Sequence, residues 1–422
     1  MAGMHSGACL LALCWACGWA VQTEPAGVAP EVLLLARIRL KMEQNLARLP
    51  NYTCIQTIER SRRRGPSRRF ELSDTLRLEV ALAGGKELFA WPGAQKFEER
   101  DLMEMVGGGT IGNGEFALHA RTLFLTNVPR FTYAGEETCN GRRAVRYDFS
   151  VPRMRSGYRI RVPPNEGVVG YHGTFWADAE TLDLMRLKIV VDDIPPNLPL
   201  AGASDTLEYR RVRIGEGDFL LPGSGELVMV DLAGNENRNR AQFSACRQYT
   251  GQSTLSFGEI PGEQPPVRQT PVSEIRLPPG LVFDLALNTE IDSATAAAGD
   301  PVSAVLTKSI RENKQVLVPK GAVFFGRLTR MERRGGPQPG IAVGLQFDLA
   351  EFGTSRVFFA ANLDDMQNVL APRGALMASA WRIEPGRRPG EGCFYVRTPR
   401  LRLARGHRTT WRTIPFTEQE KP

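Results

Sequence analysis

A long succession of short segments in which apolar and polar residues alternate constrains the fold of this chain most strongly. Three of them are TCIQTIER, FELSDTLRLEV and AVRYDFSV, and Cys139-Asn140-Gly141 supplies a tight hairpin signal before the third. A period of two is typical of strands that bury one face. Strands do not alternate regularly with helices, so we predict a mainly β fold with an antiparallel sheet.

One helix is predicted near the N-terminus, between Pro30 and Pro50. The residues that recur at helical spacing are Val32, Leu35, Ile38, Met42 and Leu46. Pro50 should end the helix, because proline cannot continue the hydrogen-bond pattern. We expect this amphipathic helix to pack on a sheet, with membrane-surface binding as the alternative.

The length of 422 residues predicts two or three domains. The segment Glu259–Val272 (EIPGEQPPVRQTPV) is rich in proline and polar residues, which is typical of a linker. It separates a first β domain at 21–258 from a second at 273–422. The second has short strands, glycine and proline turns, and a basic tail.

The N-terminus resembles a secretion signal. Residues Ala8–Val21 are uncharged and have the length of a signal-peptide core, although no lysine or arginine precedes them. Gly18 and Ala20 are small residues suited to cleavage after Ala20, so residues 1–20 are predicted to be a cleaved signal peptide. A lipoprotein is less favoured, because Leu13 before Cys14 is large for a lipobox. We therefore expect an exported, periplasmic or cell-envelope protein.

Four of the seven cysteines lie beyond this signal, at positions 54, 139, 246 and 393. An exported protein can form disulfides, and four cysteines permit three full pairings. We favour Cys54 with Cys246, because they lie in an early and a late strand of the first domain, and we keep Cys139 as a third candidate. Their wide spacing argues against a zinc site.

The chain has a formal net charge of +7, and many of its arginines lie in two runs. The candidates for contact with an anionic partner are Arg62, Arg63 and Arg64 in RSRRRGPSRR, and Arg400, Arg402 and Arg405 in the basic tail. In a cytosolic protein such runs would point to nucleic acid. In an exported protein we expect solvated surface, or contact with anionic lipid or an envelope protein partner, and no nucleic acid.

The stretch GYHGTFWADAETLDLMRLKIVV (170–191) gathers His172, Asp178 and Glu180 within nine residues. General acid–base catalysis needs such groups to converge in a dry pocket, whereas Asp178–Thr181 has the composition of a hairpin turn. No P-loop, HExxH or GxSxG motif is present. We therefore predict no catalytic, cofactor-binding or metal-ligating residues.

That same stretch resembles the central hairpin of the lipoprotein-carrier-like proteins LolA, LolB and RseB. The leading helix and LPNYTCIQTIER fit the start of that pattern. More closely, Leu49–Phe257 resembles a group of uncharacterised bacterial envelope proteins with LPxYTCxQTIER, RYDFxVP and STLxF blocks. The resemblance implies a curved antiparallel sheet with a few helices on its concave side, and lipid or acyl chains as ligands.

The second domain resembles the C-terminal β-domain of TrbI-type conjugation and type IV secretion proteins. The resemblance rests on the LPPG entry at Leu277–Gly280, the Asp292-Ser293 and Gly299-Asp300 pairs and the turn Pro319–Gly321. It covers most of Ile275–Leu363 and implies a compact, β-barrel-like module. This chain departs from the family by lacking an apolar helical hairpin, so the β-fold alone carries over.

These observations together predict a non-catalytic envelope protein. The first domain would bind a lipid or another apolar ligand without a cofactor, and the second would dock on a partner. A structural scaffold without ligand is the alternative, and a hydrolase of envelope glycans is a distant third.

Overall fold

The computed structural model describes residues 28–83, 86–94, 97, 102–106, 110–112, 116, 118–248, 273–336, 339–367 and 381–415. The predicted signal peptide and linker lie outside these ranges. The elements up to residue 248 are α1 (Pro30–Ala47), β1 (Tyr52–Arg64), β2 (Glu71–Ala83), β3 (Lys86–Ala90), α2 (Leu102–Val106), α3 (Leu118–Leu125), β4 (Arg130–Cys139), β5 (Arg142–Val151), η1 (Arg153–Arg155), β6 (Arg159–Val162), β7 (Asn165–Val168), β8 (Gly170–Asp178), β9 (Leu184–Asp192), β10 (Leu200–Ile214), β11 (Gly217–Asp231) and β12 (Asn235–Gln248).

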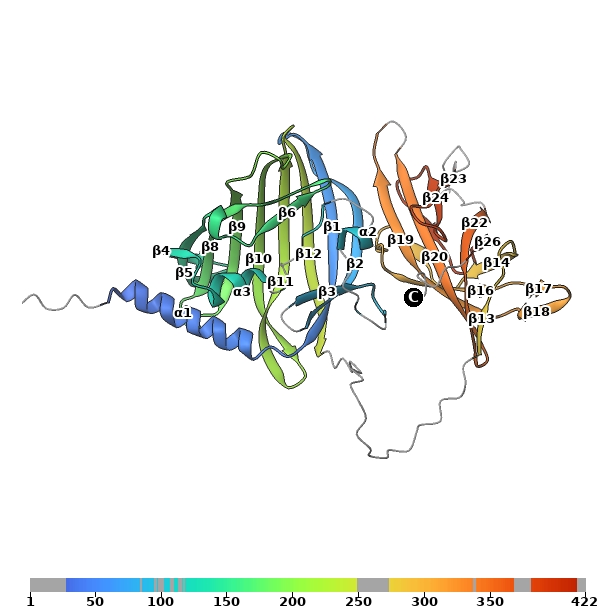
Figure 1. The fold of residues 1–422 in the computed structure, drawn as a ribbon, viewed down its shortest axis with the longest axis horizontal. Coiled ribbons are helices and arrows are strands. Elements are labelled where there is room, and N and C mark those ends of the chain that lie inside the picture. Colours follow the sequence, from blue (N-terminus) through green and yellow to red (C-terminus); the bar gives the residue numbers. More distant parts are fainter. Residues whose placement is uncertain are drawn as a thin grey trace, which may run out of the picture.

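These strands form one antiparallel sheet, which confirms the predicted fold class (Figure 1). Its order is β4-β5-β8-β9-β10-β11-β12-β1-β2-β3. β6 and β7 form a separate hairpin. Most neighbours in the sheet are also neighbours in the chain, as short hairpin connections require.

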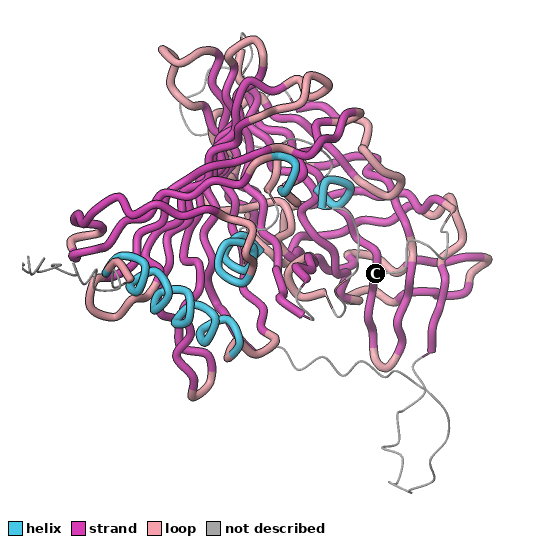
Figure 2. Tube along the Cα trace, turned by 60° about the vertical axis from the view of Figure 1, so that its left-hand side comes forward, coloured by secondary structure: helices cyan, strands magenta, loops and turns pink. Residues whose placement is uncertain are grey.

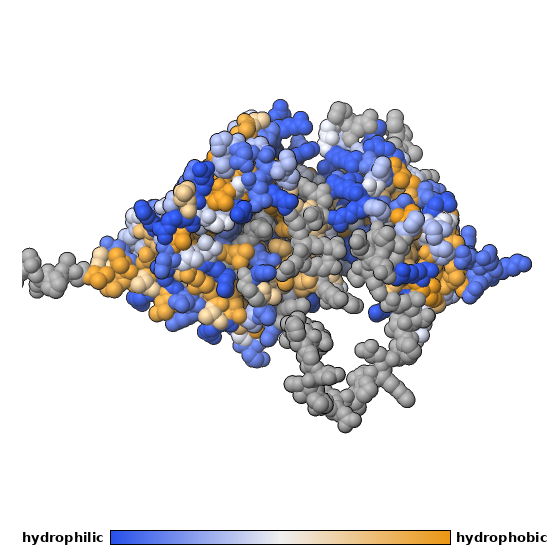
Figure 3. All heavy atoms as spheres, in the orientation of Figure 1, coloured by the Kyte–Doolittle hydropathy of each residue, from blue (hydrophilic) through white to orange (hydrophobic). Residues whose placement is uncertain are grey.

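The sheet curves around the helices, which lie on its concave side (Figure 2). Ile38 and Met42 of α1 are buried there against an apolar cluster that includes Phe124 of α3 and Phe175 of β8. The outward side of α1 is apolar as well, since Val32, Leu33 and Leu40 are each 54% exposed (Figure 3). The helix ends ahead of Pro50, as predicted.

The second part consists of short strands. They are β13 (Ser273–Arg276), β14 (Val282–Leu287), β15 (Ile291–Asp292), β16 (Pro301–Leu306), β17 (Ile310–Glu312), β18 (Gln315–Val318), β19 (Val323–Arg334), β20 (Gly340–Phe352), β21 (Ser355–Phe358), β22 (Ala360–Met366), β23 (Trp381–Glu384), β24 (Gly392–Val396), β25 (Arg402–Leu403) and β26 (Arg408–Ile414). The predicted basic tail thus contributes strands to this part.

Pairing in the second part runs β24-β20-β19-β16-β14-β26-β22. Among the described strands this ring is open between β22 and β24, so the part is barrel-like without being a closed barrel. Its core contains Phe283, Phe324 and Phe359 in mutual ring contact, and Phe347 packs edge-on against the fully buried Trp411.

The two parts meet along the edge of β2 that β3 leaves unpaired. Ala298 forms a backbone bridge with Leu76 through hydrogen bonds to Thr75 and Arg77 of 2.8 and 2.7 Å. The Arg77 guanidinium also forms an ion pair with Asp300. Covering an unpaired strand edge satisfies its backbone groups.

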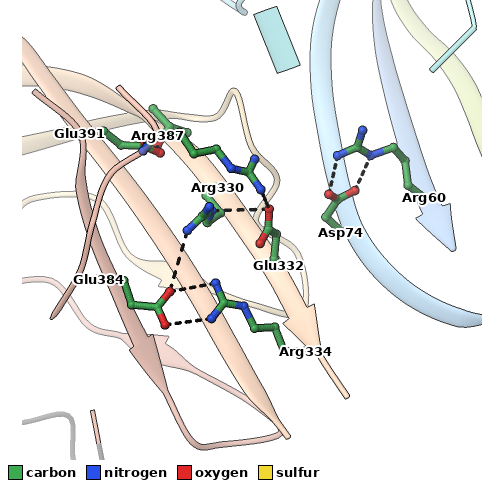
Figure 4. A network of polar contacts seen from close by, with 9 residues as sticks. Arg60, Asp74, Arg330, Glu332, Arg334, Glu384, Arg387 and Glu391 are labelled. Atoms are coloured by element: carbon green, nitrogen blue, oxygen red, sulfur yellow. Dashed lines mark hydrogen bonds and ion pairs between the residues drawn. The ribbon is translucent and has the colours of Figure 1, made fainter. Parts of the chain in front are cut away.

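Charged side chains face one another beside this contact (Figure 4). Arg60 of β1 binds Asp74 of β2 in two hydrogen bonds of 2.6 and 2.5 Å. Glu332 of β19 is the strand partner of Asp74 in β2, and the Arg330 guanidinium lies near the Glu332 carboxylate. The expectation of a solvated arginine run is therefore wrong for Arg60, which is buried because its strand position faces inward.

Candidate ligand cavity

A cavity of about 590 Å³ lies on the concave side of the first sheet. Its floor is formed by inward side chains of β5, β8, β9, β10 and β11, namely Phe149, Tyr171, Leu187, Ile189, Ala203, Leu227 and Met229. Its other walls come from β3, α2, α3 and the β6–β7 hairpin, among them Phe89, Leu102, Met103, Leu118, Leu123 and Ile160. This size and apolar lining are typical of sites for small amphiphilic molecules.

The period-two pattern builds this floor. Consecutive residues of β10 alternate between the two faces, so Ala203, Asp205 and Leu207 all point to the concave side and are buried. The small side chain of Ala203 leaves room where a larger residue would fill the cavity.

Polar side chains interrupt the apolar lining in several places, among them Glu87, His119 and Thr122. His119 of α3 lines the cavity, and its Nε2 lies 3.4 Å from Oδ2 of Asp205. The imidazole also packs edge-on against Tyr158, with 5.4 Å between ring centroids. Asp205 is 3% exposed, and its Oδ1 has no hydrogen-bond partner among the described residues. A water molecule could satisfy this buried oxygen.

The surroundings of Asp205 carry negative charge. Burial, Asp205 and Glu87 together raise the pKa of Tyr209, and burial followed by Glu87 raises the pKa of Tyr52. Both tyrosine hydroxyls are buried, and neither has a hydrogen-bond partner in the described part of the chain. Of these groups, Glu87 lines the cavity, so its wall carries a carboxylate among the apolar side chains.

The outer end of the cavity is lined by the β6–β7 hairpin, which carries Arg159, Arg161 and Glu166. Arg159 and Glu166 are 3.2 Å apart and largely exposed. A charged entrance above an apolar interior matches the two ends of an amphiphile.

The sequence did not reveal this cavity. Its recognisable signal is Asp205, a carboxylate at an inward position of a strand whose other inward residues are mostly apolar. Its partner His119 is 86 positions earlier, and only the folded chain brings the two together.

The stretch 170–191 forms the hairpin of β8 and β9, and its polar residues do not converge. Asp178 accepts hydrogen bonds from the backbone of Glu180 and Thr181, which lowers its pKa against the opposing effect of burial. His172 binds Asp192 at 2.8 Å on the exposed face of the sheet. These contacts hold the turn and the strand pair rather than an acid–base site.

The structure contains the favoured disulfide, between Cys54 of β1 and Cys246 of β12. The two strands shift register there, and Ala245 adopts φ of 47°. Cys139 and Cys393 are buried free thiols, so the third candidate is not part of a disulfide. Burial raises the pKa of the Cys393 thiol to about 12, which makes it a poor nucleophile.

The arginine candidates lie in different surroundings. Arg400 and Arg402 form ion pairs with Asp292 and Glu290 of their own part, both at 2.8 Å. Arg405 is exposed in the turn between β25 and β26.

The other three candidates follow one another at the end of β1. Arg63 binds both carboxylate oxygens of Glu236. Arg62 and Arg64 are exposed, and neither forms an ion pair with a described residue. Contact of all six arginine candidates with an anionic partner stays a prediction.

Within the described ranges, histidine, cysteine and carboxylate side chains nowhere gather in a group of three or more that could hold a metal ion. No helix in the described part of the chain is both long and apolar enough to cross a membrane.

No protein-family model and no curated protein match the chain. The solved structures that a structural search matches to this chain include a domain described as an outer membrane lipoprotein-sorting protein from Vibrio parahaemolyticus. The match has 13% identity, covers 53% of this chain and 95% of that one, and has a TM-score of 0.26. Another is a DUF1329 family protein from Desulfovibrio piger, with 12% identity, the same coverages and a TM-score of 0.31.

Proposed function

We propose that this chain is an exported, non-catalytic cell-envelope protein that binds a lipid or another apolar ligand in the cavity of its first part. The observation that carries the proposal is the cavity itself, about 590 Å³ on the concave side of the sheet with many apolar side chains in its lining. Each buried methylene stabilises the bound state by about 0.8 kcal/mol, so an acyl chain needs no strong charged anchor.

The second part would act by docking on an envelope partner. Its resemblance to TrbI-type β-domains and its exposed arginines support this role. Export with cleavage after Ala20 belongs to the same proposal, and the intact mass of protein purified from its own envelope tests it.

Filling the cavity tests ligand binding. We expect Ala203→Phe to weaken binding of a fluorescent fatty acid at least about tenfold, equivalent to about 1.4 kcal/mol, because the ring occupies the space above the floor. Ala201→Phe is the matched control, since Ala201 is exposed near the start of the same strand, where the register shifts. Displacement titrations would measure both affinities.

Two results would contradict the carrier function. If neither the native protein nor the control binds the fatty acid, and native mass spectra show only unliganded protein, the first part is a scaffold. If both variants bind as the native protein does, the ligand lies elsewhere.

A further inference from the structure

Arginines from both parts of the chain line a second, smaller groove where the parts meet. Arg62 of β1, together with Arg333 and Arg334 of β19, borders a space of about 230 Å³. Among the described residues of its lining, Glu71 of β2 is the one carboxylate. We propose that this junction groove binds a phosphate group, which would contact both parts of the chain at once.

The charges of the groove do not cancel. Arg62 is exposed and has no ion-pair partner among the described residues. Arg333 donates to the carbonyl oxygens of Ser293 and Pro399 at 2.7 and 3.2 Å, which orients its guanidinium without neutralising it. Arg334 is neutralised by Glu384 through two hydrogen bonds of 2.8 Å. Two uncompensated cations therefore face one carboxylate.

The tip of the β1–β2 hairpin, which supplies Arg62 and Glu71 to the groove, carries further positive charge. Arg64, Arg68 and Arg69 are exposed near its tip, and no described carboxylate pairs with them. Hydrophilic residues gather at the facing upper ends of the two parts (Figure 3).

The groove is also held in place before a ligand arrives. The Arg60–Asp74 pair braces the β1–β2 hairpin, and Glu384 with Arg334 and Arg330 braces the end of β19 (Figure 4). Guanidinium groups bind phosphate oxygens through parallel hydrogen bonds, and side chains that are already oriented lose less entropy on binding.

Single charge changes test the proposal in opposite directions. We expect Arg62→Ser to weaken phosphate binding about fivefold and Glu71→Gln to strengthen it about threefold, as for exposed charges. Arg311→Ser is the matched control, because Arg311 is exposed in β17, away from the groove, without a described ion pair. All three side chains are on the surface, so each variant should fold.

Two probes distinguish the source of the phosphate. Calorimetry with inorganic phosphate tests the free ion, and co-sedimentation with phosphatidylglycerol vesicles, against phosphatidylcholine vesicles, tests a lipid headgroup. Binding in either arm should decline as salt rises.

Absence of binding in both arms overturns the proposal, as does an Arg62→Ser variant that behaves like Arg311→Ser. The groove and the cavity are separate, so Ala203→Phe should leave phosphate binding unchanged. Failure of fatty acid binding therefore leaves this proposal standing, and failure of phosphate binding leaves the carrier function standing.

Discussion

Arg60 and Asp74 form an almost completely enclosed ion pair, with side chains 10% and 9% exposed. Asp74→Asn removes the carboxylate charge that binds the buried guanidinium. We expect the free energy of unfolding to fall by about 3–5 kcal/mol, because breaking a buried ion pair by changing one partner is costly. Urea denaturation followed by circular dichroism would measure the change.

The exposed pair Arg240–Glu226 supplies the control, since its side chains are 54% and 42% exposed. Glu226→Gln should cost less than about 1 kcal/mol. The double substitution Arg60→Met with Asp74→Leu should recover most of the lost stability, because both charges leave together. Equal losses for Asp74→Asn and Glu226→Gln would mean that water reaches Arg60.

At the scale of elements, the disulfide joins β1 to β12, the first and last strands of the first part, which lie side by side in the sheet. It links positions 192 residues apart, and the chain-entropy model gives about 5 kcal/mol for a loop of this length. Replacing Cys54 and Cys246 by serine should lower the free energy of unfolding by up to that amount. Cys139→Ser, the control for a buried free thiol, should cost only about 1 kcal/mol; a similar loss in both would argue that the crosslink adds nothing.

Local patterns were enough to predict most elements and the disulfide. Leu401 and Leu403 alternate with Arg400 and Arg402 in the sequence, and the structure buries the two leucines and exposes the two arginines. The cavity and the junction depend instead on residues brought together from distant segments, as with His119 and Asp205. Periodicity describes which face a residue occupies, and it carries no information about which distant element covers that face.

At the scale of the whole molecule, the two parts dock through a site that only glycine fits. Gly299 adopts φ of 104°, and a Cβ there would lie 2.1 Å from the carbonyl oxygen of Arg77 and 2.9 Å from the Trp91 ring. Both neighbours belong to the first part, and the oxygen is backbone that cannot move aside without disturbing β2. A methyl group at this position should therefore separate the parts while leaving each one folded.

We accordingly expect Gly299→Ala to increase the radius of gyration measured by small-angle X-ray scattering, with the circular dichroism spectrum unchanged. Gly280→Ala is the matched control, because Gly280 has a similar φ of 93° but nothing within 4 Å of the added Cβ. It shares the backbone strain without the steric clash. Since the junction groove needs arginines from both parts, Gly299→Ala should also abolish phosphate binding, whereas Gly280→Ala should keep it. Scattering profiles that do not differ between the two variants would show that the parts tolerate the clash, and that the groove does not depend on this contact.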